Sequence, residues 1–187
     1  MTELYLDADA CPVREEAYRV AARLGLAVFV VSNGSRPIRP PGQPGVQVVV
    51  VGEGPDAADD WIAGRIGPAD VCVTADIPLA ARCLQRGARA LSHTGHRWTE
   101  ANIGGALAGR ELARHLREIG AGGGGPAPLT KQDRSRFLSA LDAAVQAALR
   151  GRPRPRGHVR ACRSRAPDGG THGAPAPERP NTGPWES

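Results

Sequence analysis

Six aspartates carry the clearest chemical signal in this sequence. Asp7 and Asp9 follow a short apolar segment, and if that segment is a strand, their i, i+2 spacing lets both carboxylates point to one side. The other four follow two later apolar segments: Asp56, Asp59, Asp60 and Asp76. Converging carboxylates repel one another, and a divalent cation removes that repulsion, with Mg²⁺ and Mn²⁺ preferring carboxylate and water oxygens. The aspartates therefore predict a Mg²⁺ or Mn²⁺ site.

Such a site favours the hydrolysis of phosphodiester bonds. Two hard cations about 3.5–4 Å apart can hold the attacking and leaving oxygens of a phosphodiester, so that water is the nucleophile and no Ser or Cys is needed. Three polar residues at the ends of apolar segments are candidates for binding the substrate: Ser32, Asn33 and Thr74. The corresponding function is a metal-dependent nuclease, with RNA as the expected substrate.

Each group of acids also has a purely structural interpretation. The acids within residues 56–60 would open a helix, where negative charge complements the helix dipole. Asp76 could cap the helix that follows it. Asp7 and Asp9 are harder to explain in this way, because acids beside a buried strand end are costly unless they are paired. The occurrence of acids at three strand ends therefore favours a functional site.

Strand patterns alternate with helical patterns along the first 150 residues. Strands are expected at residues 4–8, 27–32, 46–51, 71–75 and 88–91. Helices are expected at residues 13–24, 56–66, 78–86, 100–119 and 130–149. This alternation predicts an α/β fold with a mostly parallel sheet covered on both faces, in which ligands bind beyond the carboxyl ends of the strands. We expect the strands that precede Asp7 and Asp76 to be neighbours at the sheet centre, so that these carboxylates can share one ion.

Composition separates a domain at residues 1–150 from a tail at residues 151–187. The tail is rich in Arg, Pro and Gly without any period, which predicts disorder. It contains seven of the 24 Lys and Arg residues but only three acids, so most of the net charge of +5 lies there. The domain itself is nearly neutral.

The chain shows no signal for a membrane or for secretion. No apolar run reaches the ~20 residues that span a bilayer. The N-terminus carries acids where a signal peptide carries basic residues. The four cysteines form no CxxC pair, so neither a zinc knuckle nor a disulfide framework is expected. We therefore expect a cytoplasmic protein that does not bind membranes.

Several short strings resemble the YaiI/YqxD family of bacterial proteins. The similarity runs in order over residues 3–149, and its most specific parts are DADACP at residues 7–12 and TADIPLA at residues 74–80. The family is similar to the PIN-domain nucleases, and this resemblance implies a PIN-like three-layer α/β/α sandwich with a cluster of acids that binds Mg²⁺ or Mn²⁺. Matched by position, the resemblance implies that three acids are catalytic and bind the metal: Asp7, Asp59 and Asp76. It implies three further metal ligands: Asp9, Asp56 and Asp60.

Two other functions remain open. A DxD string after a strand is also typical of haloacid-dehalogenase phosphatases, in which Asp7 would be the nucleophile and Asp9 the general acid. However, Cys11 replaces the usual Thr or Val, and the only lysine, Lys131, lies beyond a glycine-rich stretch. The second alternative is a module that binds nucleic acid or protein and keeps a residual metal site. A nearly neutral domain argues against tight nucleic-acid binding, although four arginines could gather near the acids: Arg36, Arg39, Arg97 and Arg110.

Overall fold

A computed structural model describes residues 1–8, 11–34, 38–39, 42–52, 54, 56–119 and 128–151. The chain divides into two units, Met1–Pro153 and Arg154–Ser187, and every described residue belongs to the first. The expectations for Asp9 and for the tail beyond Gly151 lie outside the described residues, and they stay predictions. In the part of the chain that is described, no helix is long and apolar enough to cross a membrane.

A six-stranded sheet forms the centre of the domain, in the order β3-β2-β1-β4-β5-β6. The strands are β1 (Glu3–Asp7), β2 (Ala27–Ser32), β3 (Val46–Val50), β4 (Val71–Val73), β5 (Arg89–Leu91) and β6 (Arg97–Trp98). All neighbouring strands are parallel except β5 and β6. The expected parallel sheet is therefore confirmed, with each of the five expected strands within two residues of its predicted ends.

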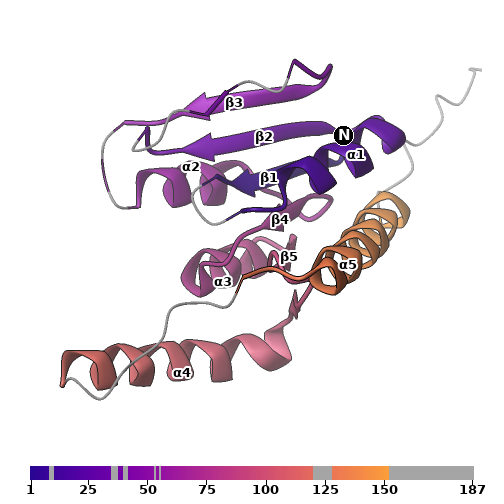
Figure 1. Ribbon diagram of the computed structural model, residues 1–187. Coiled ribbons are helices and arrows are strands. Elements are labelled where there is room, and N and C mark those ends of the chain that lie inside the picture. The colour runs from indigo at the N-terminus through magenta and orange to yellow at the C-terminus, as the bar shows by residue number, and fades with distance from the viewer. Residues whose placement is uncertain are drawn as a thin grey trace, which may run out of the picture. The chain divides into compact units, whose positions relative to one another are not determined.

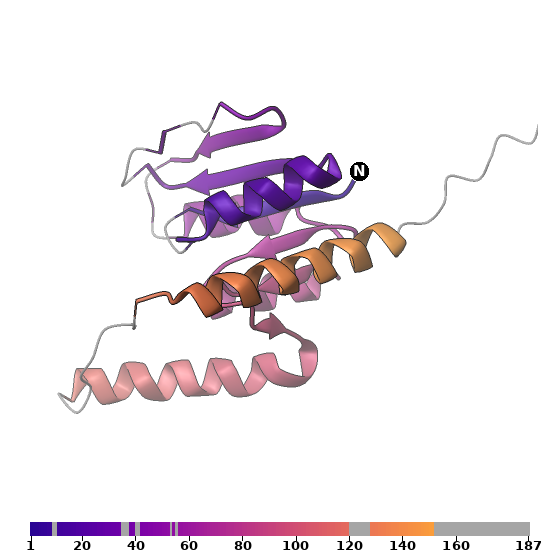
Figure 2. The same ribbon diagram turned by 45° about the vertical axis from the view of Figure 1, so that its right-hand side comes forward.

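Helices cover both faces of the sheet. On one face lie α1 (Arg14–Leu24) and α5 (Lys131–Arg150), and on the other lie α2 (Ala57–Arg65) and α3 (Ile77–Gln85). Figures 1 and 2 show the sheet between these two pairs of helices. The arrangement is a three-layer α/β/α sandwich, as expected.

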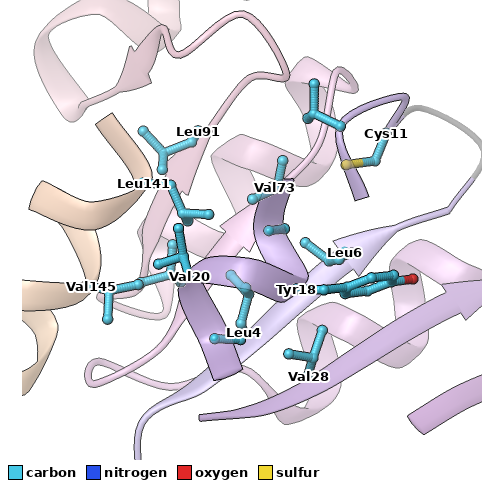
Figure 3. Close-up of a cluster of buried hydrophobic side chains, with 14 of the residues drawn as sticks. Leu4, Leu6, Cys11, Tyr18, Val20, Val28, Val73, Leu91, Leu141 and Val145 are labelled. Carbon is cyan, nitrogen blue, oxygen red and sulfur yellow. The ribbon is translucent and has the colours of Figure 1, made fainter. Parts of the chain in front are cut away.

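Alternating side chains of the central strands supply a core to each helical layer. Leu4 and Leu6 of β1 lie fully buried among residues from α1 and α5, and Figure 3 shows part of this cluster. Tyr5, between them in sequence, is buried on the opposite face with α2 and α3. Burying each such leucine stabilises the fold by roughly 1.5–3 kcal/mol. The central strand is thereby held from both sides, which fixes the position of Asp7 at its end.

An aromatic cluster anchors α2 to the sheet. The ring centroids of Tyr5 and Phe29 lie 5.3 Å apart, and that of Trp61 on α2 lies 5.9 Å from Phe29. Next to Trp61, Ile62 is fully buried. Aromatic pairs of this kind contribute about 0.5–1.5 kcal/mol each beyond the area they bury. The first turn of α2, which carries Asp59, is therefore held against the sheet.

The remaining helix, α4 (Glu100–Glu118), follows the edge strand β6. It packs against α3 and lies away from the central strands (Figures 1 and 2). Asn102 fixes its first turn, because its side-chain oxygen accepts from the N–H of Thr99 at 2.9 Å and its amide nitrogen donates to the carbonyl of Arg97 at 2.9 Å. The edge strand β6 has only two residues, too few for a strand pattern to be visible in the sequence.

Candidate functional site

The expected meeting of β1 and β4 at the sheet centre is confirmed, since the two strands pair in parallel. Successive strands run outward from β1 to β3 on one side and from β4 to β6 on the other, so the strand order reverses between β1 and β4. This reversal makes a crevice at the carboxyl ends, which is where ligands bind in open α/β sheets. Asp7 is the last residue of β1, and Thr74 and Asp76 follow β4.

Thr74 ties the two strand ends together. Its hydroxyl is fully buried and donates to Oδ2 of Asp7 at 2.8 Å, while its oxygen accepts from the backbone N–H of Asp76 at 2.9 Å. Because the Thr74 hydroxyl donates, this Asp7 oxygen is held as an acceptor in a fixed position. The side chain of Thr74 therefore positions Asp7 and Asp76, and the substrate contact expected for it stays a prediction.

A pocket of about 240 Å³ opens at this edge of the sheet. Its lining comes from the ends of β1 and β2, the first turn of α2, the end of β4 and the middle of α4. The described residues that line it are Asp7, Asn33, Asp56, Ala58, Asp59, Asp76 and Arg110. Four of the six predicted acids thus face one cavity, together with the predicted amide of Asn33.

The two acids at helix starts are not explained as helix caps. Asp56 precedes α2 and Asp76 precedes α3, each in the N-cap position. Neither side chain makes a capping hydrogen bond with its helix. Capping residues normally accept a bond from the N–H two or three residues later. The capping interpretation of Asp76 is therefore weakened, and the place of both acids in the pocket lining favours a functional role.

The carboxylates of the pocket are close enough to perturb one another. The pKa of Asp59 is raised to about 7, first by burial and then by the charges of Asp76 and Asp7, a hydrogen bond with Asp76 and the charge of Asp56. A second carboxylate beside a buried one favours the neutral form, because two adjacent negative charges repel. At neutral pH the pocket therefore carries more negative than positive charge.

Arg110 supplies a positive charge to this pocket from α4. Its Nη2 lies 3.1 Å from Oδ1 of Asp76, and the two side chains are 52% and 25% exposed. Arg110 is the only cation among the described residues that line the cavity. Of the four arginines that could gather near the acids, Arg36 lies outside the described residues, and Arg39 and Arg97 are not part of the described lining.

Besides Thr74, two predicted site residues are not among the described residues that line the cavity. Asp60 points elsewhere, because consecutive residues of a helix project about 100° apart, and its Oδ1 lies 2.6 Å from Nη2 of Arg82 in a neighbouring pocket. Ser32 is 1% exposed, and its Oγ accepts from the N–H of Gly34 at 3.2 Å. The structure therefore does not bring Asp60 to the other acids, and it gives Ser32 the role of shaping the turn that presents Asn33.

The donor types fit a hard divalent cation, since carboxylate and amide oxygens are what Mg²⁺ and Mn²⁺ prefer. The mutual repulsion around Asp59 is the electrostatic condition that such a cation relieves. Within the described ranges, however, no group of three or more His, Cys, Asp or Glu side chains is placed to hold a metal ion at once. Closure around an ion would require the carboxylates to turn inward, including Asp76, which Arg110 now holds.

Comparison with known proteins places the chain among bacterial relatives. Residues 5–147 match the model of the family described as "Uncharacterized BCR, YaiI/YqxD family". A UPF0178 protein of Rhodospirillum rubrum is 57% identical over 150 residues, covering 80% of this chain and 99% of the relative. A UPF0178 protein of Parvibaculum lavamentivorans is 57% identical over 155 residues, covering 83% of this chain and all of the relative. No solved structure matches the chain.

Proposed function

The chain belongs to the YaiI/YqxD family, and we propose that it is a cytoplasmic, Mg²⁺- or Mn²⁺-dependent nuclease that hydrolyses phosphodiester bonds in RNA. One observation carries the proposal: four carboxylates line one cavity at the point where the strand order reverses. The raised pKa of Asp59, caused first by burial and then by the neighbouring carboxylates, supports this reading. A divalent cation bound by these carboxylates would relieve their repulsion and support phosphodiester hydrolysis.

Asp7 and Asp76 are the residues best placed to hold the cation, with Asp59 and Asp56 beside them. Thr74 orients Asp7 through its 2.8 Å hydrogen bond. A bound divalent ion supplies an activated water and stabilises the charge that develops on the phosphate. Asn33 lines the same cavity, and in this proposal its side-chain amide donates to a phosphate oxygen. No protein nucleophile is required for this chemistry.

The proposal predicts slow cleavage of single-stranded RNA by the purified protein in Mn²⁺ or Mg²⁺, and loss of cleavage in EDTA. Gel electrophoresis of a labelled oligonucleotide would measure it. Asp59→Asn and Asp60→Asn form a matched pair, because the two acids are adjacent on α2 but only Asp59 lines the cavity. We expect Asp59→Asn to lower the rate by about 10–100-fold, as changes at metal sites do, and Asp60→Asn to retain the wild-type rate.

Three outcomes would contradict this function. Equal cleavage by wild type and both variants, prepared identically, would indicate a contaminating ribonuclease. Turnover of a phosphomonoester without RNA cleavage would favour a phosphatase. Retention of RNA without turnover in any metal would favour a binding module.

A further inference from the structure

Arg110 reaches the cavity from a helix that belongs to neither face of the sheet. It lies in the middle of α4, which packs against α3, and α3 begins directly after Asp76. The contact between Arg110 and Asp76 therefore joins the middle of α4 to the acidic cluster. Most of α4 beyond this point is exposed. Among the described residues that line the cavity, Arg110 is thus a single cation, and the other charged ones are all acids.

The geometry of this ion pair leaves most of the guanidinium available. One nitrogen, Nη2, makes the 3.1 Å contact, and half of the side chain is exposed. A guanidinium has five N–H donors in a planar fork, and that fork matches two oxygens of a phosphate. An ion pair this exposed contributes little free energy, so a divalent cation that needs Asp76 can displace it. A displaced Arg110 would still line the cavity.

We infer that Arg110 is the phosphate-binding residue of this cavity, and that it holds Asp76 until a divalent metal ion takes that carboxylate. The inference rests on the proposed function. Metal binding frees the guanidinium, and the freed guanidinium then binds two non-bridging oxygens of a substrate phosphate. Arg110 would thus compete with the metal in the absence of substrate and act together with it in the presence of substrate.

Arg114 provides a matched control on the same helix. It is one turn further along α4 and 61% exposed, and it pairs within the helix with Glu111 and Glu118. It is not among the described residues that line the cavity. Replacing either arginine with Gln removes one positive charge from α4, but only Arg110→Gln removes the cation that contacts Asp76.

The first measurement is Mn²⁺ affinity without RNA, from the loss of the free-ion signal in electron paramagnetic resonance. Arg110→Gln should bind Mn²⁺ roughly two- to fivefold more tightly than wild type, the range that corresponds to an exposed ion pair. Arg114→Gln should bind as wild type does. The second measurement is the binding of an unmodified single-stranded RNA oligonucleotide in Mn²⁺ as salt is varied, read directly after mixing because the expected cleavage is slow. Arg110→Gln should weaken binding and lower the slope of log affinity against log salt by about 0.7, one single-strand phosphate contact.

The outcomes separate this inference from the function on which it rests. If Arg110→Gln matches Arg114→Gln in both measurements, the inference is overturned while the nuclease proposal stands on its own cleavage test. If Mn²⁺ binds more tightly but the RNA slope does not change, Arg110 does not bind the phosphate. If none of the three proteins binds Mn²⁺, the proposed function and the inference are both overturned.

Discussion

Asp7→Asn is expected to lower metal-dependent RNA cleavage by at least about 100-fold, because it removes a negative charge from the metal ligand set. The free energy of unfolding should stay within about 1 kcal/mol of wild type or rise, because one charge leaves a group of mutually repelling carboxylates. The side-chain oxygen of the new Asn can still accept the hydroxyl of Thr74, which now donates to Asp7 at 2.8 Å. Urea unfolding and the cleavage assay, on the same preparation, would measure both quantities.

Asp70 offers a matched structural aspartate for this experiment. It is as buried as Asp7, 7% against 6% exposed, but it precedes β4, at the opposite end of the strand from Thr74. Its two carboxylate oxygens accept backbone N–H groups of Glu3 at 3.0 Å and Gly67 at 2.9 Å. Asp70→Asn replaces one acceptor with a donor, so we expect a loss of about 1–3 kcal/mol in stability with an unchanged cleavage rate. A loss of stability by Asp7→Asn equal to that of Asp70→Asn would show that Asp7 is structural.

The second large effect is a pH dependence set by Asp59. Its pKa is about 7 in the folded chain, mainly because of burial, against an ordinary value of 3.8. The folded state therefore binds its proton more tightly than the unfolded state does, and the metal-free protein should lose stability as pH rises from about 4 to about 7. Because Asp59 is only half buried, we expect a loss of about 1–2 kcal/mol, well below the unscreened value.

Mn²⁺ should reverse this dependence, because metal ions bind the deprotonated carboxylate. The stabilisation by Mn²⁺ should therefore increase as pH rises through about 7, and the cleavage rate should rise with it. Melting temperatures between about pH 5 and about pH 8, with EDTA or with Mn²⁺, would measure both trends. Asp59→Asn should flatten the EDTA curve and Asp60→Asn should not. An EDTA curve unchanged by Asp59→Asn would show that this carboxyl does not titrate near neutral pH.

The fold was predictable because its strands are short, buried and regularly spaced by helices. The continuous apolar run at Ala27–Ser32 has to be covered on both faces, and the structure covers it on both. The strand ends then place Asp7 and Asp76 together at the sheet edge, since parallel strands end on the same side. The predicted family was confirmed by the match over residues 5–147.

The rest of the site depends on side-chain direction and on distant segments. Asp59 and Asp60 are equally acidic in the sequence, and only the rotation of α2 decides which of them enters the cavity. Arg110 is separated from Asp76 by more than thirty residues, and no periodic pattern relates the two. The sequence alone could not assign an orienting role to Thr74, because a hydroxyl beside an acid can either bind substrate or orient the acid. Only the 2.8 Å bond to Asp7 distinguishes these roles.

The most direct test of the account is the position of a bound ion in a crystal of the protein soaked with Mn²⁺. The anomalous difference map should contain a peak in the cavity lined by Asp7 and Asp76, within about 2.5 Å of a carboxylate oxygen or one water molecule further away. The peak should disappear in crystals of Asp7→Asn and persist in crystals of Asp70→Asn. A saturating soak that leaves this cavity without an anomalous peak, or that places Mn²⁺ only at other sites, would contradict the account.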